Sequence, residues 1–80
     1  MELSQIIYKI HKQAESKELK PISQKEMAER LNIALSTYTE WLRGTNKPVA
    51  MKAILDMLAM LNDKDIIDSI RTWEYSEDKN

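Results

Sequence analysis

Residues 23–44 read SQKEMAERLNIALSTYTEWLRG and contain the strongest secondary-structure signals in the chain. Ser23 and Glu26 have the spacing of a capping box, in which each side chain bonds the backbone N–H of the other residue at a helix start. A helix of about eight residues is therefore expected to begin at Ser23. It is expected to end at Asn32, because asparagine adopts the left-handed conformation at a helix C-terminus more readily than other non-glycine residues.

The apolar residues that follow recur with helical spacing and predict a second short helix over residues 34–43, stopped by Gly44. At about 100° per residue, Tyr38 and Trp41 fall on its apolar face, so both are expected in the core. Because Ala34 is a weak N-cap residue, a start at position 36 is an alternative. The opposite face of this helix is polar and carries Ser36, Thr39, Glu40 and Arg43.

Three further helices are expected outside this pair, each from apolar residues at helical spacing. The first covers residues 2–16 and precedes a polar connection that contains Pro21. The second covers residues 51–61, and the third follows a cap at Asn62 or Asp63. The apolar residues of the three are, in chain order, Leu3, Ile6, Ile7, Ile10 and Ala14, then Met51, Ile54, Leu55, Leu58 and Leu61, then Ile66, Ile67, Ile70 and Trp73.

The composition favours helices throughout. The 80 residues include one glycine and two prolines, while leucine, methionine, lysine, glutamate and alanine are frequent. A chain of this length is expected to form one domain. The expected fold class is therefore all-α, with a compact five-helix bundle over residues 1–75 and a flexible polar tail over residues 76–80.

The composition also excludes several kinds of functional site. Without cysteine the chain has no disulfide, thiolate metal ligand or cysteine nucleophile. A zinc site or a Ser-His-Asp triad would need an improbable arrangement around the single histidine, His11, which we expect to be a partly exposed structural residue. No enzyme activity, metal, cofactor or small-molecule effector is expected.

No segment of the chain predicts a membrane association. The longest uncharged segment is well short of the roughly 20 apolar residues of a membrane span. The first residues, Met1-Glu2-Leu3-Ser4, lack the basic start of a signal peptide. A cytoplasmic protein without a membrane partner is the expectation.

The charges are mildly polarised along the chain. Residues 1–48 contain eight Lys and Arg against six Asp and Glu, whereas residues 49–80 contain four against seven. A polyanionic partner is therefore expected to bind residues 1–48.

Two short helices joined by a tight turn and flanked by supporting helices follow the plan of a helix-turn-helix, whose second helix enters the DNA major groove. Residues 23–44, with Lys47-Pro48 and the leucine-rich segment 51–61, resemble the Cro/Xre-type helix-turn-helix of phage repressors and related bacterial regulators. The resemblance spans residues 3–61. Its most specific parts are Ser23-Gln24, Met27-Ala28, Leu31-Asn32-Ile33, Thr37-Tyr38, Trp41 and Gly44.

The resemblance implies a set of DNA-contacting residues. Those that would contact base edges are Leu35, Ser36, Thr39 and Glu40. Those that would contact phosphates are Ser23, Gln24, Thr37, Arg43, Asn46 and Lys47. The family often has a glutamate, paired with an arginine of the first helix, at the position of Leu42, so that ion pair is expected to be absent.

The sequence thus predicts a protein that binds specific double-stranded DNA and regulates transcription as a repressor. A homodimer on a pseudo-palindromic operator is expected, because two recognition helices would then face half-sites about one duplex turn apart. Its interface is expected to involve Ile67, Ile70 and Trp73. An alternative is a protein-interaction module of the same fold, such as an antitoxin or an anti-repressor partner, which the low net charge of −1 leaves open.

Overall fold

The computed structural model describes residues 1–76, which form five α-helices and no β-strand. The helices are α1 (Leu3–Glu18), α2 (Gln24–Leu31), α3 (Leu35–Arg43), α4 (Val49–Ala59) and α5 (Asp63–Glu74). The prediction of an all-α chain with five helices is confirmed. Of the predicted polar tail, residues 77–80 lie outside the described residues. The helices divide into two units, one with α1, α2 and α3 and the other with α4 and α5.

α1 is longer than predicted. Its start is a capping box in which the backbone N–H of Glu2 donates to Oε1 of Gln5 at 2.7 Å. The predicted end at Ser16 is wrong, because Lys17 and the residue after it are good helix formers and the helix continues through them. The chain turns only at Leu19, which adopts the left-handed conformation with a φ of 59°.

The local signals for α2 are largely confirmed. Oγ of Ser23 accepts a hydrogen bond from the backbone N–H of Glu26 at 3.0 Å. The Glu26 carboxylate pairs with Arg30 one turn later, so the reciprocal half of the predicted capping box is replaced by an ion pair. Asn32 ends the helix in the left-handed conformation, with a φ of 57°.

α3 begins at Leu35, one residue after the predicted start at position 34, and the alternative start at position 36 is wrong. Ala34 is its N-cap, in an extended conformation and without a side-chain cap bond. The predicted end at Gly44 is confirmed, where a φ of 79° favours a residue without a Cβ. A Cβ there would lie no closer than 3.6 Å to Ser4, so the backbone conformation, rather than space, is the reason for glycine.

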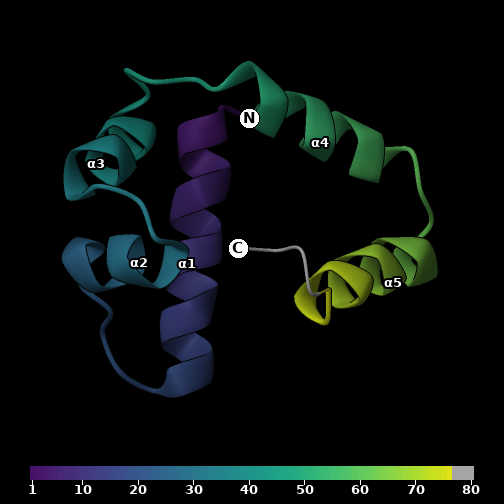
Figure 1. The fold of residues 1–80 in the computed structure, drawn as a ribbon, viewed down its shortest axis with the longest axis horizontal. Helices are drawn as coiled ribbons and strands as arrows, with labels where there is room; N and C mark the ends of the chain where they lie inside the picture. The colour runs from purple at the N-terminus through teal and green to yellow at the C-terminus, as the bar shows by residue number, and fades with distance from the viewer. Residues whose placement is uncertain (77–80) are drawn as a thin grey trace. The chain divides into compact units, whose positions relative to one another are not determined.

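The core of the first unit lies where α2 and α3 pack against α1 (Figure 1). Tyr38 is only 2% exposed, which confirms it as a core residue, and its ring meets that of the half-buried Trp41 edge-on at 6.2 Å. Ile10, predicted on the apolar stripe of α1, is exposed. The buried apolar residues are Ile22, Met27, Ala28 and Tyr38, and the partly buried ones packed against them are Ile7, Ala14, Ile33, Trp41 and Leu42.

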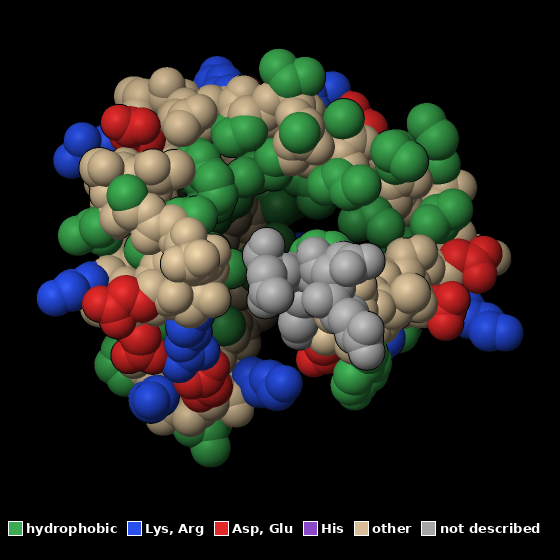
Figure 2. Space-filling view, viewed as in Figure 1, with side chains coloured by type: hydrophobic (Ala, Val, Ile, Leu, Met, Phe, Trp, Pro, Cys, Tyr) green, Lys and Arg blue, Asp and Glu red, His purple; other side chains and the backbone are tan. Residues whose placement is uncertain are grey.

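The second unit contains no buried residue in either of its helices. α4 begins at Val49, two residues before the predicted start. The side chain of Asn62 caps α5 by accepting the backbone N–H of Asp65 at 2.9 Å, which resolves the choice between two predicted caps. Figure 2 shows hydrophobic side chains along α4 on the face in view. None of the helices in residues 1–76 has the length and apolar character to cross a membrane.

Candidate nucleic-acid interface

The inner face of α3 is tied to α1 by a buried histidine. Nε2 of His11 lies 2.7 Å from the carbonyl oxygen of Ile22, and Nδ1 lies 2.7 Å from the hydroxyl of Tyr38. Because a carbonyl can only accept, Nε2 carries the proton, and in the neutral ring Nδ1 accepts from the Tyr38 hydroxyl. His11 is only 6% exposed, so the prediction of a partly exposed residue is wrong: both ring nitrogens find partners inside the protein.

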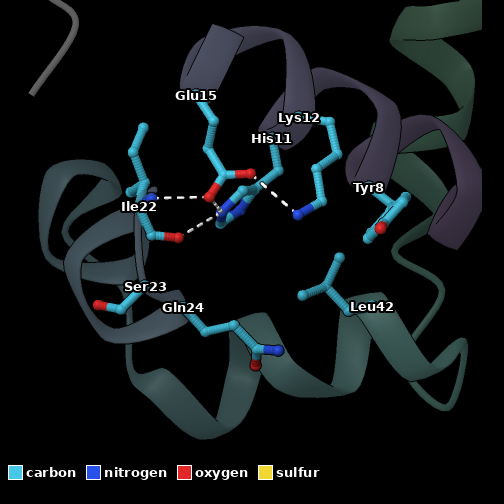
Figure 3. Close-up of a pocket in the computed structure, with 8 residues that line it drawn as sticks. All are labelled: Tyr8, His11, Lys12, Glu15, Ile22, Ser23, Gln24 and Leu42. Atoms are coloured by element: carbon cyan, nitrogen blue, oxygen red, sulfur yellow. Dashed lines mark hydrogen bonds and ion pairs between the residues drawn. The ribbon is translucent and has the colours of Figure 1, made fainter. Parts of the chain in front are cut away.

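Glu15, one turn after His11, holds the same segment from its other side. Its carboxylate accepts the backbone N–H of Ile22 at 2.7 Å and lies 3.0 Å from the ammonium of Lys12 (Figure 3). The Ile22 hydrogen bond, followed by the Lys12 ammonium, lowers the pKa of Glu15 below its ordinary value. Burial, with a smaller contribution from Glu15, raises the pKa of Tyr38. The backbone N–H of Ile22 is thus bound by Glu15 and its carbonyl by His11, and both side chains belong to α1.

A pocket of about 370 Å³ adjoins this cluster, between α1, the start of α2 and the end of α3. The ammonium of Lys12 lies 5.3 Å from the centre of the Tyr8 ring, and Leu42 adds an apolar side chain from α3 (Figure 3). Among residues 1–76, no three His, Asp or Glu side chains gather as they would around a metal ion. The residues that line the pocket are Tyr8, His11, Lys12, Glu15, Ile22, Ser23, Gln24 and Leu42.

The outer face of α3 presents most of the predicted base-contacting residues to solvent. Leu35, Ser36 and Glu40 are exposed, whereas Thr39 is half-buried. Arg43, at the end of the same face, is exposed and makes no ion pair within the described residues. This face therefore offers an apolar group, a hydroxyl, a carboxylate and a guanidinium along one helix.

The other predicted phosphate-contacting residues lie at the start of α2, on α3 and after α3. At the start of α2, Ser23 and Gln24 are exposed, and Oε1 of Gln24 accepts a hydrogen bond from Thr39 at 3.0 Å. Thr37 on α3 is half-buried. After α3, the half-buried Asn46 donates its backbone N–H to the carbonyl of residue 40 at 3.4 Å.

Lys47 forms an ion pair with the N-terminal segment. Its ammonium lies 3.6 Å from the carboxylate of Glu2, and both side chains are largely exposed. An exposed pair of this kind contributes roughly 0–1 kcal/mol and is easily exchanged. Lys47 can therefore leave Glu2 for a phosphate at little cost.

The ten predicted DNA-contacting residues all belong to residues 23–47 of the first unit, where the structure joins the side chains of Gln24 and Thr39 by a hydrogen bond. The predicted dimer residues belong to α5 of the second unit, where Ile67, Ile70 and Trp73 are 60%, 45% and 56% exposed. Glu15 was missed, and His11 was expected to be a structural residue but not a buried one, although it follows Ile7 by one turn on α1. Comparison of the chain with protein-family models, curated proteins and solved structures found no match in any of the three.

Proposed function

We propose that the chain is a sequence-specific DNA-binding protein of the Cro/Xre type, in which α2 and α3 form a helix-turn-helix and α3 is the recognition helix. The contrast between the two faces of α3 carries this proposal. Tyr38 is buried and bonded to α1, whereas Ser36 and Glu40 are exposed on the other side. A recognition helix needs both a fixed inner face and an open outer face.

The chemistry of the outer face suits base edges in a major groove. Glu40 can accept from the N4 amino group of cytosine, and Leu35 can contact the methyl group of thymine. Ser36 can donate or accept, and so can bond several base edges. Arg43 can bind guanine or a nearby phosphate.

The start of α2 suits a phosphate. Gln24 is exposed at the first helical position, where backbone N–H groups and the helix dipole favour an anion. In the proposed complex Ser23, Gln24 and Lys47 contact phosphates next to the groove that α3 enters. Such contacts fix the register of α3 without reading sequence.

The charge balance of the first unit favours selective binding. Lys12, Arg30 and Lys47 are paired with carboxylates. Five further cations of the first unit make no ion pair within the described residues; these are Lys9, Lys17, Lys20, Lys25 and Arg43. Because Glu40 repels phosphates, we expect affinity to depend strongly on the correct base beside it.

Repression by a homodimer is the mode of action that we propose. A dimer bound at a promoter would exclude polymerase, and the exposed Ile67, Ile70 and Trp73 would form its interface. Trp73→Ser and Ile70→Asp should then weaken self-association. Analytical ultracentrifugation that finds only monomer at tens of micromolar without DNA would argue against a preformed dimer.

Selection from a random duplex library, followed by anisotropy titrations at several salt concentrations, tests the function. The chain should enrich a defined motif, and Arg43→Ala should reduce the slope of log K against log salt by about 0.9, the value for one lost phosphate contact. Gln24→Ala removes no charge, so it should lower affinity at every salt concentration without changing the slope. Lys64→Ala removes one exposed cation of α5 and serves as the matched control, with no change expected.

A library that yields no enriched motif would contradict the proposal. The alternative, a protein-interaction module of the same fold, would then be favoured. If Arg43→Ala and Lys64→Ala alter DNA retention equally, α3 is not the binding face.

A further inference from the structure

The hydrogen bond between Thr39 and Gln24 joins the two sets of predicted contact residues. The Thr39 hydroxyl donates to Oε1 of Gln24 at 3.0 Å, across 15 residues of sequence. It connects the middle of α3 with the first residue of α2. Thr39 is half-buried, in contrast to the exposed Ser36 and Glu40.

A glutamine amide has an accepting end and a donating end, so it matters which end Thr39 binds. The terminal torsion of glutamine is broad and nearly two-fold, so the oxygen and the NH₂ group can exchange places at little cost. Phosphate oxygens only accept hydrogen bonds, so a phosphate can be bound by Nε2 but not by Oε1. Once Oε1 is occupied by Thr39, both N–H bonds of Nε2 are available to an outside acceptor.

Leu35 cannot supply this restraint, although it precedes Thr39 by one helical turn. Its side chain is apolar and exposed, and it has no group that could bond an amide. Thr39 is the residue of α3 whose side chain holds Gln24 within the described residues. In the observed arrangement the Thr39 hydroxyl donates to Oε1, which leaves the NH₂ group as the end of the Gln24 amide that faces outside acceptors.

We propose that Thr39 is a positioning residue rather than a base-contacting residue: its hydroxyl orients the Gln24 amide so that the NH₂ group faces a DNA phosphate. This inference rests on the proposed function, because it assumes the Gln24–phosphate contact. Under this proposal Thr39 affects the affinity for every duplex, whereas the exposed Ser36 and Glu40 on α3 determine the base preference.

The test compares a substitution that replaces the hydroxyl by a methyl group of similar size with one that keeps the hydroxyl and removes the methyl group. Thr39→Val removes the hydroxyl, whereas Thr39→Ser keeps it. Thr39→Val should weaken binding roughly 2- to 10-fold, the factor expected for one net hydrogen bond, and equally for all duplexes of the selected library. Thr39→Ser should bind like the wild type. Thermal unfolding of both variants checks that the fold is intact.

A double-mutant cycle isolates the coupling between the two residues. Once Gln24→Ala is present, adding Thr39→Val should cause no further loss of affinity. In the free protein, ¹⁵N relaxation of the Gln24 side-chain amide should show increased motion in Thr39→Val but not in Thr39→Ser. This readout does not depend on DNA.

Three results would overturn the inference while the proposed function stands: wild-type affinity in Thr39→Val, additive losses in the double variant, or an altered preference at a single base pair. The last result would make Thr39 a base reader. If the wild type enriches no duplex, the proposed function fails and the inference fails with it. Restricted Gln24 motion would then identify the bond as purely structural.

Discussion

The imidazole of His11 and the hydroxyl of Tyr38 are 27 residues apart in the chain and share a buried hydrogen bond of 2.7 Å. The centres of the two rings lie 5.8 Å apart. Both side chains are buried, so water could not replace either partner if one of them were removed. This bond fixes the inner face of α3 against α1. The same bond therefore contributes both to the stability of the fold and to the position of α3.

Tyr38→Phe is expected to lower the free energy of unfolding by about 1–3 kcal/mol, because it leaves the Nδ1 atom of His11 buried without a donor. Urea denaturation followed by circular dichroism at neutral pH measures the change. Tyr75→Phe is the matched control: Tyr75 is 82% exposed, and the substitution should change stability by less than about 0.5 kcal/mol. Equal losses in the two variants would show that the buried hydroxyl has no special role.

Glu15→Gln is expected to reduce the acid sensitivity of the fold. The pKa of Glu15 is lowered in the folded protein from an ordinary value of 4.5, so the stability that it contributes is fully present above pH 4.5 and is lost as the pH falls through the folded-state value. The wild type should therefore lose stability more steeply below pH 4.5 than the variant. Urea titrations between neutral pH and pH 3 measure both slopes.

Glu29→Gln provides the control for that experiment. Glu29 is exposed, and its carboxylate makes no ion pair within the described residues. Its removal should leave the slope of the wild type unchanged. If Glu15→Gln also keeps that slope, the hydrogen bond to Ile22 does not favour the charged form.

Leu19→Gly is expected to stabilise the protein. Leu19 has a φ of 59° and is almost fully exposed, so it bears the cost of a left-handed conformation and gains little burial in return. That conformation costs an ordinary residue about 1–2 kcal/mol, of which glycine should recover roughly 1 kcal/mol after its larger backbone entropy is counted. Thermal unfolding measures the gain. Lys17→Gly, two residues earlier inside α1, should instead lose about 0.5–1 kcal/mol.

Ala34→Ser is expected to add about 1 kcal/mol to the free energy of unfolding. Ala34 already has the extended backbone of an N-cap but no side-chain oxygen to accept the free N–H groups of α3. Ser23→Ala makes the opposite change at the start of α2 and should cost about the same amount. A loss of stability in Ala34→Ser would mean that the N–H groups of α3 are already satisfied.

The parts of the fold that were predictable from sequence depend on neighbouring residues. Asn32 and Gly44 end their helices as predicted because the left-handed conformation is a property of one residue and its two peptide bonds. Ser23 caps α2 because its partner is only three residues away. Such signals are complete within a few positions of the chain.

The links between helices were not predictable in this way. One partner of His11, Tyr38 on α3, is 27 residues away in the chain. The other partner is the backbone carbonyl of Ile22, which no sequence pattern identifies. The bond from Thr39 to Gln24 likewise requires α2 and α3 to be in place first. The outward direction of Ser36 and Glu40 followed from helical periodicity alone, but the orientation of the amide beside them did not.

The hydrogen bonds from α1 to the peptide groups of Ile22 determine where the chain can be lengthened. Glu15 holds the N–H and His11 holds the carbonyl, so the position where α2 begins does not depend on the length of the connection before it. Extra residues inserted next to the exposed Lys20 would form a longer solvent loop, at an entropic cost that grows only slowly with length. That connection is a natural place to graft a peptide epitope or a fluorescent label without displacing α3.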